Sequence, residues 1–370
     1  MKKIAIQSTY TLQGWDENSY ATGGIGGSEI WAIKVADEFA KRGYSVYLFG
    51  NPNEVHTSST GVRYFQSSDY KYISENFEFD YFIFSRIFPD NIDKVLSKNI
   101  FIMAHNYNIG YMPSEYVPGY DRVKKILCLS KYQREFIKEL YKYVKDDRLA
   151  YVRNGVDGFL YEKYNNIPQK NQMVCSNGKY RQALWIVTYV FPLIKKEIPD
   201  FELLLCSYDE TFEEPVFHQD GIRIIGDRDK QITREDLIKA QCESKIWVYA
   251  NTSFWGLDNN YHINETFCIT ALEAACSKSA IIVGEKSPFP ETLAGYDYFL
   301  GKELFHENIL SNMPIENQEK FASLGRNIYL PFPLVLCRYV LLKIYQMFYN
   351  LHLSKTYIVL LFPSQLVLHF

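Results

Sequence analysis

The sequence predicts an α/β protein made of two consecutive doubly wound, Rossmann-like halves. Short apolar runs alternate with amphipathic segments through the first half, which is typical of a parallel sheet covered by helices on both faces. A polar, turn-rich segment at 158–172 interrupts this rhythm, and the same alternation then restarts. At 370 residues the chain is long enough for two domains. We therefore expect an N-terminal domain at 1–160, a C-terminal domain at 161–325 and a tail of different character at 326–370.

Each half is expected to contribute its own series of strands and helices. The first half has predicted strands at 3–7, 45–50, 81–85, 100–104, 125–129 and 149–152, and its clearest helices at 28–42 and 131–143. The second half has predicted strands at 173–176, 201–207, 222–225, 246–250 and 280–284, with helices ending near 197 and at 235–243 and 267–276. Ligands of doubly wound sheets bind at the carboxyl ends of strands, so residues that follow a strand are the first site candidates.

The composition narrows the class of protein. Hydrophobic residues make up 47% and charged residues 22% of the chain, as in a globular protein with an ample core. The formal net charge of −3 argues against a nucleic-acid partner, which normally selects a basic face. The seven cysteines form no CxxC pair and lie mostly in apolar runs, which predicts reduced thiols in a cytoplasmic protein. The apolar run after the N-terminal Met-Lys-Lys is too short for a signal peptide.

The tail differs from the rest of the chain in charge. Glu319 is the last acidic residue, and five Lys or Arg residues follow it. Its apolar runs are broken by Pro331, Pro333 and Pro363, and none reaches the roughly 20 residues that span a bilayer. Three interpretations stay open: an apolar, basic anchor at a membrane surface, a buried element crossing back to the first domain, or an aberrant end of the reading frame.

A glycine-rich loop and a histidine are candidate site elements in the first half. Residues 22–29 place four glycines in five positions at the start of a predicted helix, where exposed backbone N–H groups suit a phosphate or another anion. The alternative is a flexible loop in which Ser28 caps the helix. His105 ends the predicted strand 100–104 and so lies at a carboxyl edge, although a single histidine is more often a structural hydrogen-bonding residue.

Two carboxylates, Glu265 and Glu273, flank a predicted buried helix in the second half. A buried carboxylate is costly unless it is paired or hydrogen-bonded, so Glu273 needs a protein partner or a hydroxyl-rich ligand. If the segment is helical throughout, with Asn264 as N-cap, the two glutamates lie about 12 Å apart along the axis. They then cannot share one metal ion, but they can contact two parts of an elongated ligand. The alternative is one surface glutamate and one glutamate in a buried salt bridge.

Two basic residues, Lys179 and Arg181, follow the first predicted strand of the second half and precede a helix. Together with the helix N–H groups they would form a clamp for a diphosphate. The alternative, on position alone equally favoured, is a pair of solvated basic side chains.

Taken together, these residues resemble the retaining glycosyltransferases of family 4, the group 1 family with the GT-B fold. The matching segments occur in the family's order through most of the chain: 23–29, His105, 129–134, 154–157, 176–181, Glu265 with Glu273, and 289–292. The two glutamates with Asn-Gly-Val-Asp upstream are the more specific part. The chain departs from the family pattern at Lys179 and Arg181, which lie closer together than the family's two basic residues, and at Gln182, where a glycine is common. The resemblance implies two Rossmann-like domains facing across a cleft, with the acceptor on the first and the nucleotide-sugar donor on the second.

The resemblance also implies roles for individual residues. Four would be catalytic: His105, Lys179, Arg181 and Glu265. Six would bind the donor: Gly26, Gly27, Glu265, Thr266, Phe267 and Glu273. His105 would line the sugar pocket, the two basic residues would neutralise the leaving diphosphate, Glu265 would hold the transferred sugar and Glu273 the ribose. No metal ion would be needed, and no cofactor beyond the nucleotide-sugar co-substrate, because basic side chains and a helix N-terminus take the metal's part.

The function implied is that of a hexosyltransferase-type enzyme, which moves a sugar with retention of configuration to a hydroxyl of a glycan, lipid or other acceptor. The protein would be cytoplasmic, at the membrane surface if the tail is an anchor. Two alternatives stay open: a sugar-nucleotide epimerase of the same fold, which needs no acceptor, and a catalytically silent GT-B partner or scaffold protein. A NAD-dependent dehydrogenase is disfavoured, because no acidic residue is placed correctly after a tight glycine turn.

Overall fold

The computed structural model describes residues 1–8, 14–22, 25–86, 88–109, 119–164, 166–176, 183–184, 186–206, 212–226, 232–249, 265–284, 288–293 and 299–301. The chain divides into two compact units, Met1–Gly155 and the residues from Val156 onward. The predicted tail at 326–370 lies outside the described residues, and so do Lys179 and Arg181. Within the described ranges, no helix has both the length and the apolar character needed to cross a membrane.

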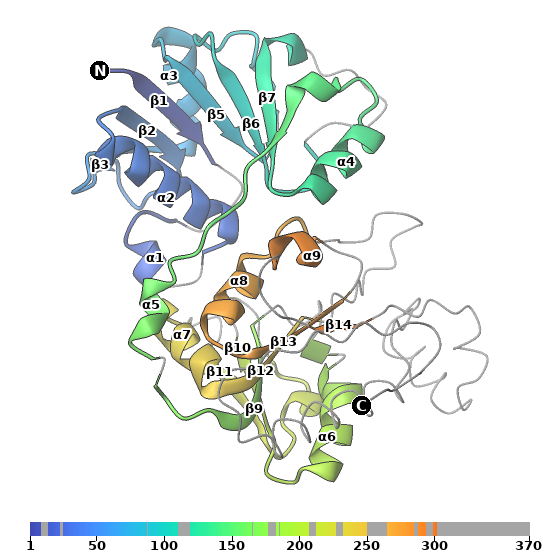
Figure 1. The fold of residues 1–370 in the computed structure, drawn as a ribbon. Coiled ribbons are helices and arrows are strands. Elements are labelled where there is room, and N and C mark those ends of the chain that lie inside the picture. The colour runs from blue at the N-terminus through green and yellow to red at the C-terminus, as the bar shows by residue number, and fades with distance from the viewer. Residues whose placement is uncertain are drawn as a thin grey trace. The chain divides into compact units, whose positions relative to one another are not determined.

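The first unit is built on a sheet whose described strands are ordered β3-β4-β2-β1-β5-β6-β7-β8 (Figure 1). Neighbouring strands are parallel except β3 and β4. The strands are β1 Lys3–Gln7, β2 Ser45–Gly50, β3 His56–Thr57, β4 Arg63–Gln66, β5 Tyr81–Ser85, β6 Ile100–Ala104, β7 Val123–Cys128 and β8 Leu149–Tyr151. The helices are α1 Ser19–Thr22, α2 Gly27–Lys41, α3 Tyr70–Asn76 and α4 Lys131–Leu140.

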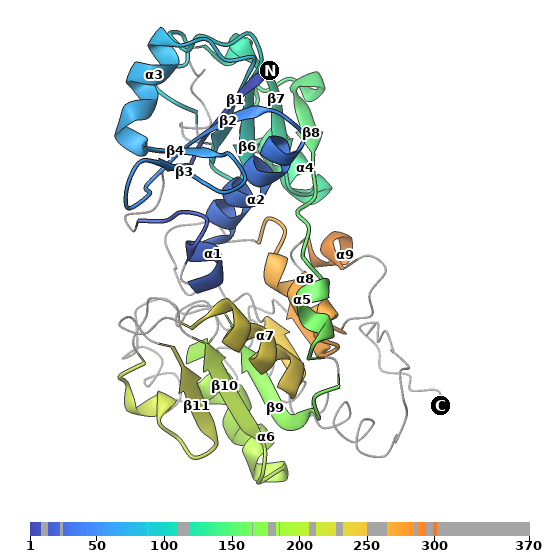
Figure 2. The ribbon, with the colours of Figure 1, turned by 90° about the vertical axis from the view of Figure 1, so that its left-hand side faces the viewer.

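The second unit is built on a sheet ordered β11-β10-β9-β12-β13-β14 in which every described pair is parallel (Figure 2). The strands are β9 Lys170–Cys175, β10 Glu202–Cys206, β11 Ile222–Ile225, β12 Ser244–Tyr249, β13 Ala280–Gly284 and β14 Phe299–Gly301. The helices are α5 Phe159–Glu162, α6 Phe191–Glu197, α7 Arg234–Glu243, α8 Ile269–Cys276 and α9 Phe289–Thr292, with a π-helical turn at Ile186–Val190 before α6.

Each sheet has a central first strand and one point where the strand order reverses. In the first unit that switch point lies between β1 and β5, and in the second between β9 and β12. At the first switch point, Ser8 follows β1 and Ser85 is the last residue of β5, and their hydroxyls are hydrogen-bonded at 3.4 Å. In the second, Trp247 donates its indole N–H to Ser176 at 3.1 Å. The predicted doubly wound α/β architecture is therefore confirmed, and each unit has its own switch point, where sheets of this kind bind ligands.

The burial of the central strands explains why they could be predicted from the sequence. Central strands are apolar on both faces, and in β1 Ile4, Ala5 and Ile6 are all buried. In the first unit aromatic rings fill the space between sheet and helices, for example Phe82 against Phe84 with ring centroids 4.5 Å apart. Such two-sided burial produces the continuous apolar runs that a parallel sheet requires.

Two helix boundaries differ from the predictions for local reasons that the structure shows. Helix α4 ends at Leu140, not at 143, because the buried Tyr141 leaves the helix and its hydroxyl bonds to Ile109 N at 3.1 Å. Helix α8 begins at Ile269, two residues later than predicted, because Cys268 has a φ of +63° and cannot be helical. Asn264, the predicted N-cap of that helix, lies outside the described residues. Strands β3, β4 and β14 and helices α1, α3, α5 and α9 were not predicted.

Candidate functional site

In the first unit, three elements border the switch point: the start of α2 and the residues that follow β5 and β6. Arg86 follows β5 and has a φ of +82°, a left-handed conformation that is strained for a residue with a side chain. His105 follows β6. Gly26 and Gly27 lie at the N-terminus of α2, and a Cβ at Gly26 would be 3.9 Å from Nη2 of Arg86. The structure thus brings together the glycine loop and the histidine that the sequence singled out separately.

An ion pair between a buried carboxylate and a guanidinium lies at this switch point. Glu29 is fully buried, and its Oε1 lies 3.3 Å from Nη2 of Arg86, whose side chain is 17% exposed. Ser28 connects the two, because it accepts from Nε of Arg86 at 3.0 Å and donates to Oε2 of Glu29 at 2.9 Å. The first turn of α2 therefore already holds one negative charge, which is favourable at a helix N-terminus.

Gly26 is the N-cap of α2, and its lack of a side chain is required for this arrangement. A Cβ at Gly26 would lie closer than van der Waals contact to Oε2 of Glu29. Glu29 is the third helical residue, from which a carboxylate can fold back over the helix start. The glycine at this position is thus explained by the close approach of Glu29.

His105 is held in its neutral form. It is 9% exposed, and its ring meets Trp31 edge to face with centroids 5.1 Å apart. Burial, and secondly the charge of Arg86, lower the pKa of His105 to about 3. At neutral pH His105 can therefore act as a hydrogen-bonding group, but it carries no proton to give as an imidazolium.

In the second unit, the predicted donor residues gather at the start of α8. Tyr249, the last residue of β12, donates its hydroxyl to Oε2 of Glu265 at 2.6 Å, which orients that half-buried carboxylate. Thr266 and Phe267 are buried behind Glu265, and the carbonyl of Phe267 accepts a hydrogen bond from Thr292. Because α8 begins at Ile269, its N-terminus lies between the two glutamates in the sequence.

Glu273 has a protein partner. It is 3% exposed in the second turn of α8, and its Oε1 lies 2.6 Å from Nη1 of Arg234, the first residue of α7. The salt bridge that the sequence left open as an alternative is therefore present. However, Oε2 of Glu273 is buried without a hydrogen-bond partner among the described residues. An unsatisfied buried acceptor costs about 1–3 kcal/mol, so the salt bridge alone does not account for this carboxylate.

The sequence analysis did not identify three residues that lie at these two switch points: Arg86, Tyr249 and Arg234. Arg86 and Tyr249 could have been found by the rule that selected His105, since each lies at or just after a strand's carboxyl end. For Arg234 the only local signal is its place after the N-cap Thr233, which does not indicate a partner on another helix.

The comparisons with known proteins are structural. No family model and no curated protein matches the sequence. The chain is similar to sucrose-phosphate synthase from Thermosynechococcus elongatus (TM-score 0.58, 13% identity, covering 95% of this chain and 100% of that one). It is also similar to a glycosyltransferase from Rickettsia africae (TM-score 0.57, 16% identity, 94% and 99%). A third is Anabaena HepE, solved with UDP and glucose (TM-score 0.53, 12% identity, 95% and 100%).

The chain has the GT-B fold. It consists of two consecutive Rossmann-like units, each with its own switch point, and the structural similarity extends over nearly the whole chain. At such low sequence identity the similarity establishes the fold and leaves the chemistry to be argued from the residues.

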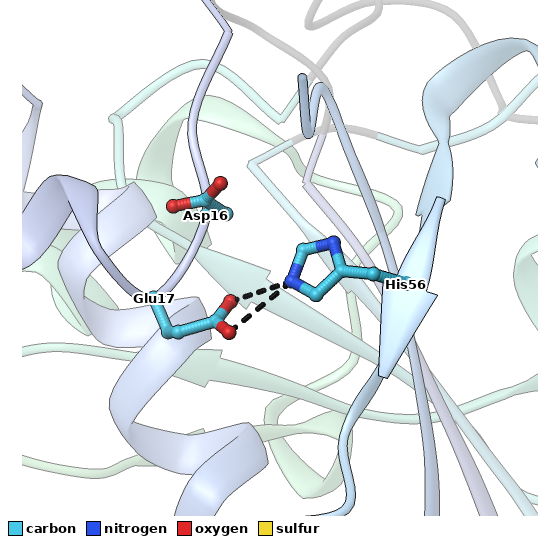
Figure 3. Close-up of side chains that lie close together, drawn as sticks. All are labelled: Asp16, Glu17 and His56. Carbon is cyan, nitrogen blue, oxygen red and sulfur yellow. Dashed lines mark hydrogen bonds and ion pairs between the residues drawn. The ribbon is translucent and has the colours of Figure 1, made fainter. Parts of the chain in front are cut away.

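A separate cluster of ionisable groups lies in the first GT-B unit, formed by Asp16, Glu17 and His56 (Figure 3). Their ligand atoms lie within 4.8 Å of one another, which is close enough to hold a metal ion. His56 Nδ1 donates to the Glu54 carbonyl at 2.9 Å, and Nε2 faces the Glu17 carboxylate at 2.9 Å. In protonated His56 both ring nitrogens donate to these acceptors, and a metal ion at Nε2 would have to displace the proton there.

This cluster should make the stability of the first unit depend on pH. The hydrogen bond to Glu54 is the largest cause that raises the pKa of His56 above its ordinary value; burial acts against it, and Glu17 adds to the rise. The stabilisation is thus fully present below the unfolded pKa of about 6.5 and is lost as pH rises through the higher folded pKa. Glu17→Gln should therefore lower Tm more at about pH 6 than at about pH 9. Equal effects at both pH values would contradict this assignment.

Proposed function

We propose that the protein is a retaining glycosyltransferase of the family 4 kind that transfers a hexose from a nucleotide-sugar to a hydroxyl of a glycan, lipid or other acceptor. The observation that carries the proposal is the arrangement at the second switch point. Glu265 and Glu273 stand on either side of the α8 N-terminus, each held by another side chain, Tyr249 or Arg234. Carboxylates recognise hydroxyls, and a helix N-terminus recognises a diphosphate.

Each part of a nucleotide-sugar has a matching group. Glu265 accepts hydrogen bonds from the hydroxyls of the transferred sugar, and Oε2 of Glu273 accepts from the ribose. The start of α8 faces the diphosphate, with Lys179 and Arg181 supplying positive charge as it departs. These basic groups take the part of a metal ion, so the reaction requires none. The departing nucleoside diphosphate and an oxocarbenium-like sugar are the species to be stabilised.

The first unit supplies the acceptor side in this proposal. Arg86, Gly26 and the neutral His105 lie at its switch point. The glycine loop approaches the donor phosphates or the acceptor there, and His105 hydrogen-bonds a hydroxyl of the transferred sugar near the reacting carbon. The protein acts in the cytoplasm, and contact with a membrane surface is proposed only if the tail proves to be an anchor.

The similar structures support a nucleotide-sugar as the donor class. Anabaena HepE was solved with UDP and glucose, and WaaG is a glycosyltransferase of lipopolysaccharide biosynthesis with a TM-score of 0.55 and 12% identity. UDP-sugars are therefore the first donors to test.

The test is a thermal-shift screen against UDP-, GDP-, ADP- and dTDP-sugars, followed by NMR of the product. A donor at about 100 times its Kd should raise the free energy of unfolding by about 2.7 kcal/mol. NMR with an acceptor panel should show a product that keeps the donor's anomeric configuration. A changed nucleotide-sugar formed without acceptor would indicate the epimerase instead. If no nucleotide-sugar stabilises the chain, the proposal fails.

A further inference from the structure

We propose that Arg234 is a positioning residue of the site in the second unit: it holds Oε1 of Glu273 so that Oε2 is presented to the ribose hydroxyls of a nucleoside diphosphate. The inference rests on the proposed function, because it takes Glu273 as the group that contacts the nucleotide. It goes further by assigning a role to a residue on a different helix and by naming the carboxylate oxygen that binds.

The backbone of Arg234 is fixed independently of Glu273. Arg234 is the first residue of α7, and the N-cap Thr233 accepts a hydrogen bond from Asp236 N at 3.1 Å. Helices α7 and α8 pack against each other (Figure 2). The guanidinium therefore reaches Oε1 of Glu273 from a neighbouring helix whose first turn is already capped, and both side chains are largely buried.

The second carboxylate oxygen of Glu273, Oε2, can accept a hydrogen bond from a ligand. Oε2 of Glu273 is buried and has no hydrogen-bond partner among the described residues. Tyr161 lies near Glu273: burial is the first cause that raises the pKa of the Tyr161 hydroxyl, and the charge of Glu273 is the second. That hydroxyl nevertheless donates to Gln241 at 3.0 Å and not to Glu273. Buried acceptors are normally satisfied, and a carboxylate oxygen can accept from two hydroxyls. The adjacent 2′- and 3′-hydroxyls of a ribose have this chemistry.

An arginine is suited to this task because it stays charged and binds with fixed geometry. With Oε1 bound, the carboxylate cannot turn freely about its terminal torsion, which is otherwise soft. Without the cation, the carboxylate can turn away, and Oε2 would then accept less well from a ribose.

The test compares wild type and Arg234→Gln for binding of UDP, GDP and ADP and of their 2′,3′-dideoxy counterparts, by titration calorimetry on the full chain. In Arg234→Gln the affinity for the ribonucleotide should fall about 10- to 100-fold. The affinity for the dideoxy nucleotide should stay unchanged, so the preference for ribose disappears. Arg234→Lys should restore part of the preference.

Lys239→Gln is the matched control, because Lys239 lies on the same helix in an exposed pair with Glu243 at 3.9 Å. It should leave both affinities unchanged. Equal losses for the ribo- and dideoxy nucleotides, or no loss, would overturn the positioning role and leave the proposed function standing. If wild type binds none of the nucleoside diphosphates, the proposed function fails and the inference with it. If Arg234→Gln does not fold, Arg234→Lys decides: a ribose preference equal to that of wild type counts against the inference.

Discussion

Replacing Glu265 by alanine is expected to lower kcat/KM for sugar transfer by about 10- to 100-fold, if Glu265 holds hydroxyls of the transferred sugar. Hydrogen bonds to a charged group are worth about 1.5–3 kcal/mol, and those that strengthen in the transition state appear directly in the rate. Glu265 is half-buried and precedes α8, so its loss leaves the helix and the sheet behind it in place. The measurement is steady-state kinetics with the donor found in the screen.

Tyr249→Phe separates orientation from charge. The hydroxyl of Tyr249 lies 2.6 Å from Oε2 of Glu265, so the phenylalanine variant keeps the carboxylate and removes only the group that orients it. We expect a loss of about tenfold or less, smaller than that of Glu265→Ala, because the carboxylate that binds the sugar hydroxyls is still present. A folded Glu265→Ala variant with wild-type turnover would remove Glu265 from the site. A larger loss in Tyr249→Phe than in Glu265→Ala would show that Tyr249 does more than orient the carboxylate.

The largest effect on stability is expected from Glu29→Ala in the first unit. This change leaves Arg86 without its carboxylate partner in a largely buried position, and breaking a buried pair typically costs about 3–5 kcal/mol. Arg86 keeps some access to solvent, so we expect the lower end of that range. For a unit of this size the loss corresponds to a fall in Tm of about 6–12 °C, measurable by calorimetry.

Glu38→Gln is the control for this variant, because it makes the matching loss of a carboxylate on the same helix. Glu38 pairs with Lys41 at 2.8 Å, but both side chains are more than half exposed. Exposed pairs contribute little, so the Tm should not change measurably. A Glu29→Ala variant that melts at the wild-type temperature would show that Arg86 finds another partner or reaches water at no cost.

The strands at the centre of each sheet could be predicted closely, because burial on both faces leaves a continuous apolar run. The predicted ranges 3–7 and 45–50 coincide with β1 and β2. Strand β3 lies at the edge of the sheet and β4 lies next to it. Both were missed because they are short and include exposed or half-buried polar residues such as Arg63 and Gln66. Period and hydropathy carry no signal for such a strand.

The site residues divide in a similar way. Position after a strand was enough to select His105, and helical composition was enough to ask why Glu273 is buried. The partners of these buried carboxylates are distant in the sequence and could not be predicted from it. Arg86 is 57 residues from Glu29, and Arg234 lies on a different helix from Glu273. The left-handed backbone of Arg86 is likewise set by tertiary packing and leaves no local pattern. The proposed diphosphate clamp of Lys179 and Arg181 stays a prediction.

The central place of β1 has a consequence for synthesis of the chain. One edge of β1 pairs with β2, but the other waits for β5, and the contacting residues Ser8 and Ser85 are 77 positions apart. At about 5–20 residues per second, a ribosome needs about 4–15 s to supply that second partner. For that interval a nascent strand that is apolar on both faces has one unpaired edge, the feature that promotes aggregation. Because β9 waits for β12 in the same way, each chain passes through two such intervals, and chaperone demand should peak at both.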